Sequence, residues 1–239
     1  ERQTNYFLCQ RTNVQRITSQ GGLVDMRIRF DEQLKQLNKE MINMGTMIEK
    51  SIGDAVKALM KQDVELAQKV MAGDEEIDRT ERKIEDLCLR LLLQQQPVAR
   101  DLRNISAALK MVTDMERIGD HATDISELAI VLSEKTYVKK LDHIEEMARE
   151  TMVMLIQSLE AYVEKDLDKA QKVIAHDDVI DDLFEEVKQE LIELIRNHAD
   201  EGEQAVDLLM VTKYFERIGD HATNIAEWVI FSITGQIAG

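Results

Sequence analysis

The sequence predicts an all-α protein built from two tandem three-helix bundles. Helix-breaking residues are scarce, because the 239 residues include one proline and ten glycines. Aromatic residues make up 4% of the chain, whereas Leu, Met, Glu, Lys and Gln, which favour helix over strand, are abundant. The third observation is an internal repeat: a unit of about a hundred residues with helical sequence patterns occurs twice in the chain.

The repeat consists of two matched segments. Residues 63–74 reappear as 166–177 with an offset of 103, and Glu-Arg-Ile-Gly-Asp-His-Ala-Thr at 116–123 reappears at 216–223 with an offset of 100. Because insertions and deletions fall in loops, the difference places a loop between the matched segments. Pro97 marks that loop in the first copy, and residues 197–202 contain it in the second.

The first copy is expected to contain three helices. Apolar residues at three- and four-residue steps predict a helix over roughly residues 27–61. Asp63 can cap the second helix, which runs to about Gln96 because Pro97 disfavours helical backbone in the residue before it. The third helix runs over about residues 99–133, with an apolar inner side.

The second copy repeats this pattern, with helices expected at about 141–164, 166–197 and 203–233. Long helices joined by short turns pack antiparallel in bundles, and the joint between the bundles is expected near Lys135–Lys140. The predicted division is a leader or extension outside the fold at 1–25, a first three-helix repeat at 26–136 and a second at 137–239.

The net charge of −16 disfavours nucleic-acid binding, since such a chain repels phosphate backbones and has no local basic patch. No run of 18 apolar residues is present, so no membrane span is predicted. The first 25 residues lack the apolar centre of a signal peptide. Cys9 and Cys88 are too far apart for a metal-finger spacing, and two such cysteines suit a reducing cytoplasm as well as any other compartment.

Acidic stripes are the candidate functional feature. In each repeated segment, oxygen-bearing side chains four residues apart lie on one helix face, and the preceding helix carries a matching pair. The first copy contains Glu116, Asp120 and Asp124 with Asp74 and Asp78; the second contains Glu216, Asp220 and Asn224 with Asp177 and Asp181.

The register of an antiparallel hairpin predicts which acids face each other. If Asp120 faces Asp78, the turn centres on half the sum of their numbers, 99, which is beside Pro97. If Asp220 faces Asp181, the turn centres on 200.5, inside residues 197–202. The same registers set Asp124 against Asp74 and Asn224 against Asp177.

Facing acidic stripes are unfavourable without a cation, because unit charges ~6 Å apart repel by ~3 kcal/mol at an effective dielectric near 20. A bound hard cation reverses that sign, so the stripes predict a metal site in each copy. The alternative is an ordinary solvated face on which Arg117 and Arg217 neutralise the aspartates. His121 and His221 lie about 100° around the helix from the stripe and are interpreted as bystanders.

At these residues the sequence resembles the PhoU family over about residues 26–237. The resemblance rests on residues 96–103 (Gln-Pro-Val-Ala-Arg-Asp-Leu-Arg), on the two Glu-Arg-Ile-Gly-Asp segments and on the C-terminal Ile-Thr-Gly-Gln at 233–236. It implies two three-helix bundles, often dimeric, and some members of the family bind multinuclear iron or zinc through a Glu/Asp-x-x-x-Asp motif. That motif corresponds here to Glu116 with Asp120 and Glu216 with Asp220.

The resemblance also implies the biology. PhoU-like proteins are non-enzymatic cytoplasmic regulators that couple the ATPase subunit of a phosphate ABC transporter to a sensor histidine kinase. They damp phosphate-starvation signalling and reach the membrane's inner face through these partners, without inserting into it. Two alternatives remain: a metal-free helical scaffold or adaptor, and a di-iron carboxylate oxidase, although the Glu-x-x-His pairs of ferritin-like sites are missing beside the stripes.

Overall fold

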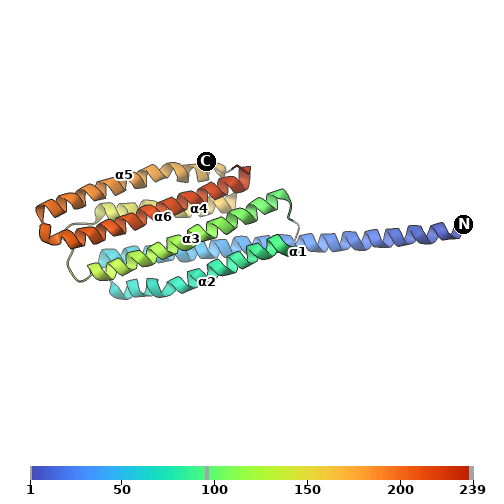
Figure 1. Ribbon diagram of the computed structural model, residues 1–239, viewed down its shortest axis with the longest axis horizontal. Helices are drawn as coiled ribbons and strands as arrows, with labels where there is room; N and C mark the ends of the chain where they lie inside the picture. The colour runs from blue at the N-terminus through green and yellow to red at the C-terminus, as the bar shows by residue number, and fades with distance from the viewer. Residues whose placement is uncertain (1, 95–96, 237–239) are drawn as a thin grey trace.

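Helices form every regular element in the residues that the structure describes. The computed structural model describes the backbone of residues 2–94 and 97–236 and the side chains of residues 27–93 and 97–236. The α-helices are α1 (Arg2–Lys61), α2 (Val64–Gln94), α3 (Ala99–Leu132), α4 (Asp142–Glu164), α5 (Leu167–Asn197) and α6 (Gly202–Thr234), with a short 3-10 helix at Ala199–Glu201 (Figure 1). The predicted all-α class is therefore confirmed.

The helices form two antiparallel three-helix bundles that lie side by side (Figure 1). Helices α1, α2 and α3 pack together, as do α4, α5 and α6. The bundles meet along α3 and α6 and also along α1 and α4, while α2 and α5 contact helices of their own bundle and form the outer edges. The connection between the bundles spans residues 133–141, where the sequence placed the joint.

Equivalent turns open the second helix of each bundle. Gln62 and Lys165 adopt left-handed backbone with φ of 53° and 55°, a conformation that costs a non-glycine residue ~1–2 kcal/mol. The residues that follow, Asp63 and Asp166, each accept a hydrogen bond of 3.0 Å from the backbone amide three residues on. Such a cap stabilises a helix by about 1 kcal/mol, which offsets much of the strain. The cap expected at Asp63 is confirmed.

The helix boundaries otherwise follow the sequence pattern closely. Pro97 lies between α2 and α3, and α3 begins at Ala99 as expected. The first helix differs, because its backbone begins at Arg2 rather than near residue 27. The division at residues 25 and 26 stays a prediction. None of the helices in the described part of the chain is long and apolar enough to cross a membrane.

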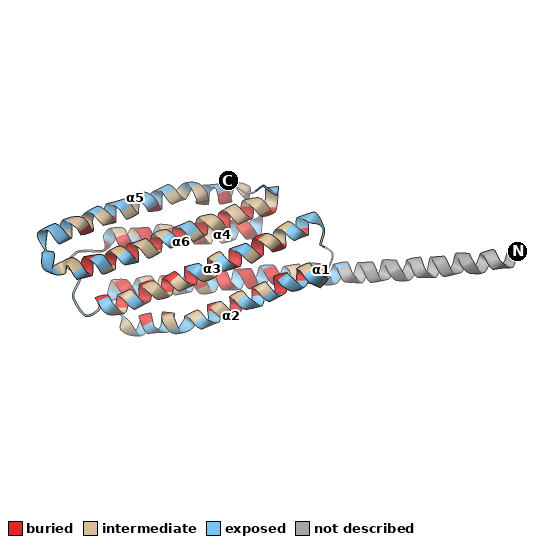
Figure 2. Ribbon diagram, viewed as in Figure 1, coloured by how far each residue is buried: buried red, intermediate tan, exposed pale blue. Residues whose placement is uncertain are grey.

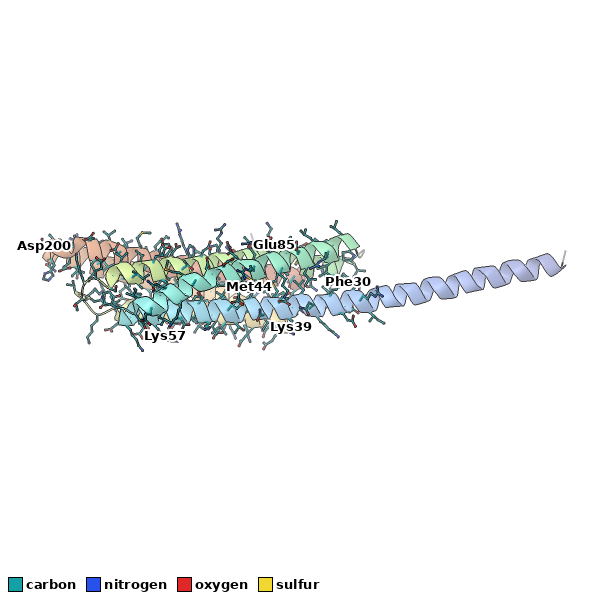
Figure 3. The ribbon with its side chains drawn as sticks, turned by 90° about the horizontal axis from the view of Figure 1, so that it is seen from below. Phe30, Lys39, Met44, Lys57, Glu85 and Asp200 are labelled. Atoms are coloured by element: carbon teal, nitrogen blue, oxygen red, sulfur yellow. The ribbon has the colours of Figure 1, made fainter. Side chains whose placement is uncertain are left out.

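The core runs along the inner faces of both bundles (Figure 2). In α1, Met41, Met44 and Ile48 are fully buried at three- and four-residue steps, and each such burial contributes about 1.5–3 kcal/mol. Figure 3 shows Met44 among the helices, whereas Lys39 and Lys57 point outward from α1. Met41 and Met44 are therefore core residues. The acidic stripes lie at the α2–α3 and α5–α6 seams.

Candidate metal centre

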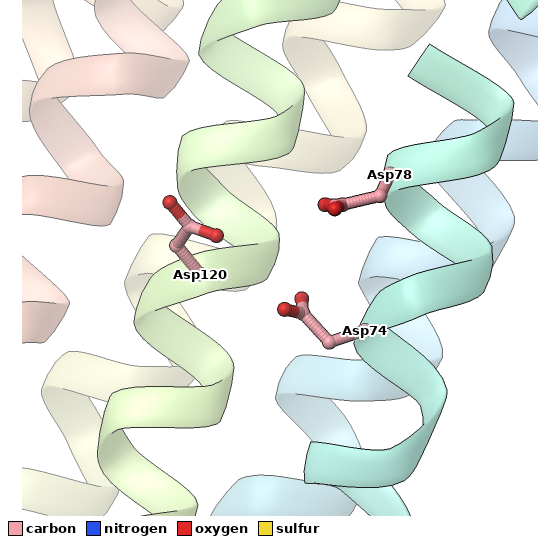
Figure 4. A group of neighbouring side chains, drawn as sticks. All are labelled: Asp74, Asp78 and Asp120. Atoms are coloured by element: carbon pink, nitrogen blue, oxygen red, sulfur yellow. The ribbon is translucent and has the colours of Figure 1, made fainter. Parts of the chain in front are cut away.

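Three aspartates from two helices converge in the first bundle. Asp74 and Asp78 point from α2 toward Asp120 on α3 (Figure 4). One carboxylate oxygen from each residue can be chosen so that all three lie within 4.8 Å of one another. The facing of Asp120 and Asp78 confirms the hairpin register that the sequence predicted.

This spacing fits a single hard cation. Oxygen ligands bind divalent cations at about 2.0–2.6 Å, so two ligands on opposite sides of one ion lie about 4–5 Å apart. The oxygens of Asp74, Asp78 and Asp120 are within that limit. Because all three donors are carboxylates, the set suits hard cations better than soft ones.

The carboxylates repel one another. The pKa of Asp74 is raised by burial and then by the charges of Asp120 and Asp78. Two arginines reduce this repulsion: Arg82 donates to Asp78 at 2.9 Å and Arg117 donates to Asp120 at 2.9 Å. Both arginine side chains are more than half exposed, so these pairs contribute little stability and leave the inner oxygens facing each other.

Glu116 extends the first cluster by one helical turn. Its Oε2 atom is buried without a hydrogen-bond partner, although Arg117 Nε lies 3.4 Å away. Burial and repulsion from Asp120 raise the Glu116 pKa. A buried carboxylate oxygen without a donor costs stability unless a cation or water satisfies it, so Glu116 fits a metal ligand.

Glu81 is a further acid that the sequence reasoning missed. It lies on α2, and burial followed by repulsion from Glu116 raises its pKa to about 7. Glu81 continues the stripe of Asp74 and Asp78, which was the available signal. The equivalent residue in the second copy is Phe184, so the internal repeat does not mark this position.

Gly119 permits the close packing of α2 against α3. A Cβ atom there would lie 3.2 Å from two carbons of Ile77 and 3.8 Å from Oδ1 of Asp74. The equivalent Gly219 has its nearest contact with Ile180 at 3.4 Å and lies 3.6 Å from Oδ1 of Asp177. Each glycine therefore faces an isoleucine and an aspartate of the neighbouring helix.

The second bundle places its acids similarly. Burial, then repulsion from Glu216 and Asp177, raises the pKa of Asp220, and Asp181 adds a smaller repulsion. Oε2 of Glu216 is also buried, but unlike its counterpart in the first copy it lies against the ammonium group of Lys213. Within the described residues, however, the first bundle alone brings three acids within 4.8 Å.

Basic and aromatic residues distinguish the second cluster. Lys213 forms an ion pair with Glu216, whereas the first copy has Thr113 at the equivalent position. Lys213 and Lys188 also lie over the Phe184 ring, 5.4 and 5.6 Å from its centroid. The second cluster therefore has fewer carboxylates and a resident ammonium group that competes with a cation.

The residues one turn beyond the central aspartates have other partners. Asp124 is hydrogen-bonded to His121 Nδ1 at 3.1 Å, and the Asn224 amide donates to Asp114 at 3.1 Å. His221 Nδ1 is also within 2.9 Å of Asp114, so these side chains serve the α3–α6 contact. The interpretation of the histidines as bystanders and a metal role for Asp124 and Asn224 stay predictions.

Comparison with known proteins agrees with this architecture. The PhoU domain model matches residues 41–129 and 144–229, one match in each bundle. A phosphate-specific transport system accessory protein PhoU homolog from Clostridium acetobutylicum is 40% identical over 208 residues, covering 87% of this chain and 95% of that protein. A homolog with the same description from Pseudomonas aeruginosa is 34% identical, with 87% and 86% covered.

Solved structures agree as well. The crystal structure of PhoU from Pseudomonas aeruginosa has a TM-score of 0.84 at 33% identity and covers 87% of this chain and 100% of that chain. The phosphate transport system regulatory protein PhoU from Streptococcus pneumoniae has a TM-score of 0.82 at 26% identity, covering 88% and 99%. With two matched domains and this similarity over most of its length, the chain belongs to the PhoU family.

Proposed function

We propose that this chain is a metal-binding, non-enzymatic regulator of phosphate uptake and of phosphate-starvation signalling. It acts by protein–protein contacts with a phosphate ABC transporter, through the ATPase subunit, and with a sensor histidine kinase. It works in the cytoplasm at the inner face of the membrane, as a homodimer, and represses the starvation response when phosphate is plentiful. Its relatives' names, which describe phosphate transport accessory and regulatory proteins, support the phosphate pathway.

The observation that carries the metal part is the cluster of Asp74, Asp78 and Asp120. Its carboxylate oxygens have the spacing of ligands around one cation, and Glu116 adds a buried oxygen that lacks a hydrogen-bond donor. Iron or zinc is the proposed metal. When bound, the metal supplies positive charge that ties α2 to α3 and converts a repulsive seam into an attractive one. That seam then presents a more rigid surface to partner proteins.

Metal analysis of purified protein tests the cluster. The triple variant Asp74→Asn, Asp78→Asn, Asp120→Asn is expected to lose the metal of the first bundle, because amide oxygens carry no charge to bind it. Asp86→Asn is the matched control, since Asp86 is an exposed aspartate of the same helix α2. Equal metal content in the wild type, the triple variant and the control would overturn the metal proposal.

A phosphate-responsive reporter in cells tests the regulatory part. Cells without the protein are expected to express starvation genes at high phosphate, and the wild type is expected to restore repression. Affinity capture from cells grown with and without phosphate should recover the transporter ATPase and the kinase. A protein that leaves the reporter unchanged and captures neither partner would contradict the proposed pathway.

Two ion pairs, Arg82 with Asp78 and Arg117 with Asp120, are the observation that supports the alternative of a metal-free scaffold. Arg82 and Arg117 already neutralise part of the Asp78 and Asp120 charge, at 2.9 Å each. If the scaffold reading holds, chelator-treated protein and the triple variant bind the partners as the wild type does. The di-iron oxidase is less favoured because the acids that converge within 4.8 Å in the described residues, Asp74, Asp78 and Asp120, include no histidine. Oxygen consumption by iron-loaded protein would revive it.

A further inference from the structure

A groove lies between α1 and α4, away from the acidic seams. It has a volume of about 260 Å³. Ile42 and Val163, 48% and 51% exposed, line it together with the half-buried Ile156 and Leu159. In Figure 1, α1 and α4 lie behind α3 and α6, so the groove belongs to the other inter-bundle contact.

The packing of the bundles maintains the groove. A Cβ atom at Gly45 of α1 would lie 2.5 Å from Cδ1 of Leu159, so the helices touch directly at this point. Nearby, the buried Tyr162 hydroxyl donates a hydrogen bond of 2.8 Å to Asn38 of α1. These contacts join the two bundles beside exposed apolar side chains, and the floor of the groove is therefore part of the folded core.

The size of the groove favours side-chain anchors over a whole cofactor. Sites for drug-sized ligands occupy about 300–1,000 Å³, which exceeds the space here. An amphipathic helix needs less, because it inserts anchor residues from one face at steps of three and four residues. An apolar seam between two helices matches that mode of binding.

The charges around the groove select the kind of helix. All charged residues that line it are acidic: Glu49, Glu160 and Glu164. Lys169 forms ion pairs of 2.8 Å with both Glu160 and Glu164. Glu49 has no ion pair in the described part of the chain. A second copy of this chain, or an anionic lipid surface, would bring negative charge against these glutamates and against a net charge of −16.

We propose that the α1–α4 groove binds a basic amphipathic helix of a partner protein. Apolar anchors of that helix contact Ile42, Ile156 and Val163, and its lysines or arginines face Glu49. This proposal deepens the regulatory function above by naming the chemistry of a partner, and it rests on that function only for the partner's identity. The groove and its charges are independent of metal binding.

A designed peptide tests the groove with the full chain. The probe has leucines on one helical face and lysines on the other, with a scrambled peptide of the same composition as a control. The double variant Ile42→Asp, Val163→Asp is expected to weaken binding by about tenfold or more, the loss of a typical anchor contact. Val206→Asp, at a valine of α6 that is 54% exposed, is the matched control and should bind like the wild type.

Fluorescence anisotropy in physiological salt gives the affinities, and Glu49→Lys provides a second variant that keeps the apolar surface intact. Glu49→Lys should weaken binding and reduce its dependence on salt. Equal affinity of the wild type and both groove variants, or equal affinity for the scrambled peptide, would overturn the proposal. A wild-type dimer that the double variant dissociates in sedimentation would also overturn it, because the groove would then hold a second copy.

Two further measurements separate this proposal from the proposed function. The metal content and the reporter response of the cluster variants decide the regulatory function without reference to the groove. If those results support regulation while the peptide binds the groove variants as tightly as the wild type, only the groove proposal is refuted. If the peptide binds as expected while the reporter does not respond to the protein, the proposed pathway is refuted and the groove proposal is supported.

Discussion

Asp120→Asn is expected to change stability in opposite directions without and with metal. One oxygen of Asp120 lies within 4.8 Å of oxygens of both Asp74 and Asp78. Two unit charges at that distance repel by ~3.5 kcal/mol at an effective dielectric of about 20. Solvent exposure and the loss of the Arg117 pair reduce this gain to about 1 kcal/mol. Without metal, the variant should therefore melt about 2–4 °C above the wild type.

With metal bound, the wild type should instead melt at a higher temperature than Asp120→Asn. A cation present at a hundred times its dissociation constant stabilises the wild type by about 2.7 kcal/mol. In a protein of this size that corresponds to a rise of about 5–10 °C in Tm. Asp120→Asn loses a charged ligand and should show a much smaller rise. The assay is thermal unfolding by circular dichroism in chelator, with Zn²⁺, and with Fe²⁺ under nitrogen; Asp86→Asn is the control.

Two results would refute this reasoning. If Asp120→Asn is less stable than the wild type in chelator, the three aspartates do not repel one another in the folded state. If its Tm rises with metal as much as that of the wild type, Asp120 is not a ligand. A shift of the same size in Asp86→Asn would show that the metal stabilises the protein at other sites.

Three further predictions concern individual residues of the two seams. Lys213→Thr removes the ammonium group that competes with a cation in the second bundle, so the metal-to-protein ratio should rise in metal analysis; an unchanged ratio contradicts this. Gly219→Ala should stabilise the protein in urea unfolding by about 0.5–1 kcal/mol through helix propensity. Gly119→Ala should give no gain, because its Cβ would lie 3.2 Å from Ile77; an equal gain at both sites would show that this contact yields freely. The pKa of Glu81 is raised to about 7, so the folded protein binds this proton more tightly than the unfolded chain does. The stability of the metal-free protein should therefore fall as the pH rises from the ordinary pKa of a glutamate, 4.5, to about 7. Glu81→Gln should narrow the difference in unfolding free energy between pH 5 and pH 8 by on the order of 1 kcal/mol, after allowance for solvent screening. An identical pH dependence in wild type and variant would contradict it.

The helices and the facing of Asp78 and Asp120 were predictable from local patterns. Pro97 and the Asp63 cap mark helix ends through their own backbone chemistry. In an antiparallel hairpin, one loop position determines every facing pair, so the register of the acids followed from residue numbers. The repeat predicted the same arrangement in a second copy.

The partners of the remaining polar residues required the tertiary structure. Asn224 was expected opposite Asp177, yet its amide donates to Asp114 of the other bundle. Glu81 has no acidic counterpart in the second copy, where Phe184 replaces it, and its raised pKa depends on burial and on its proximity to Glu116. Contacts of this kind depend on how two bundle surfaces fit together, which no period or spacing along one helix specifies.

The eight-residue segment at 116–123 and its repeat thus specified one wall of each acidic seam, because helical spacing places its acids on one face. Only the folded chain distinguished the two seams. In the first, Glu81 adds a carboxylate, whereas in the second Lys213 forms an ion pair with Glu216. The α1–α4 groove also emerged only from the packed bundles, since helices far apart in the sequence form its two sides.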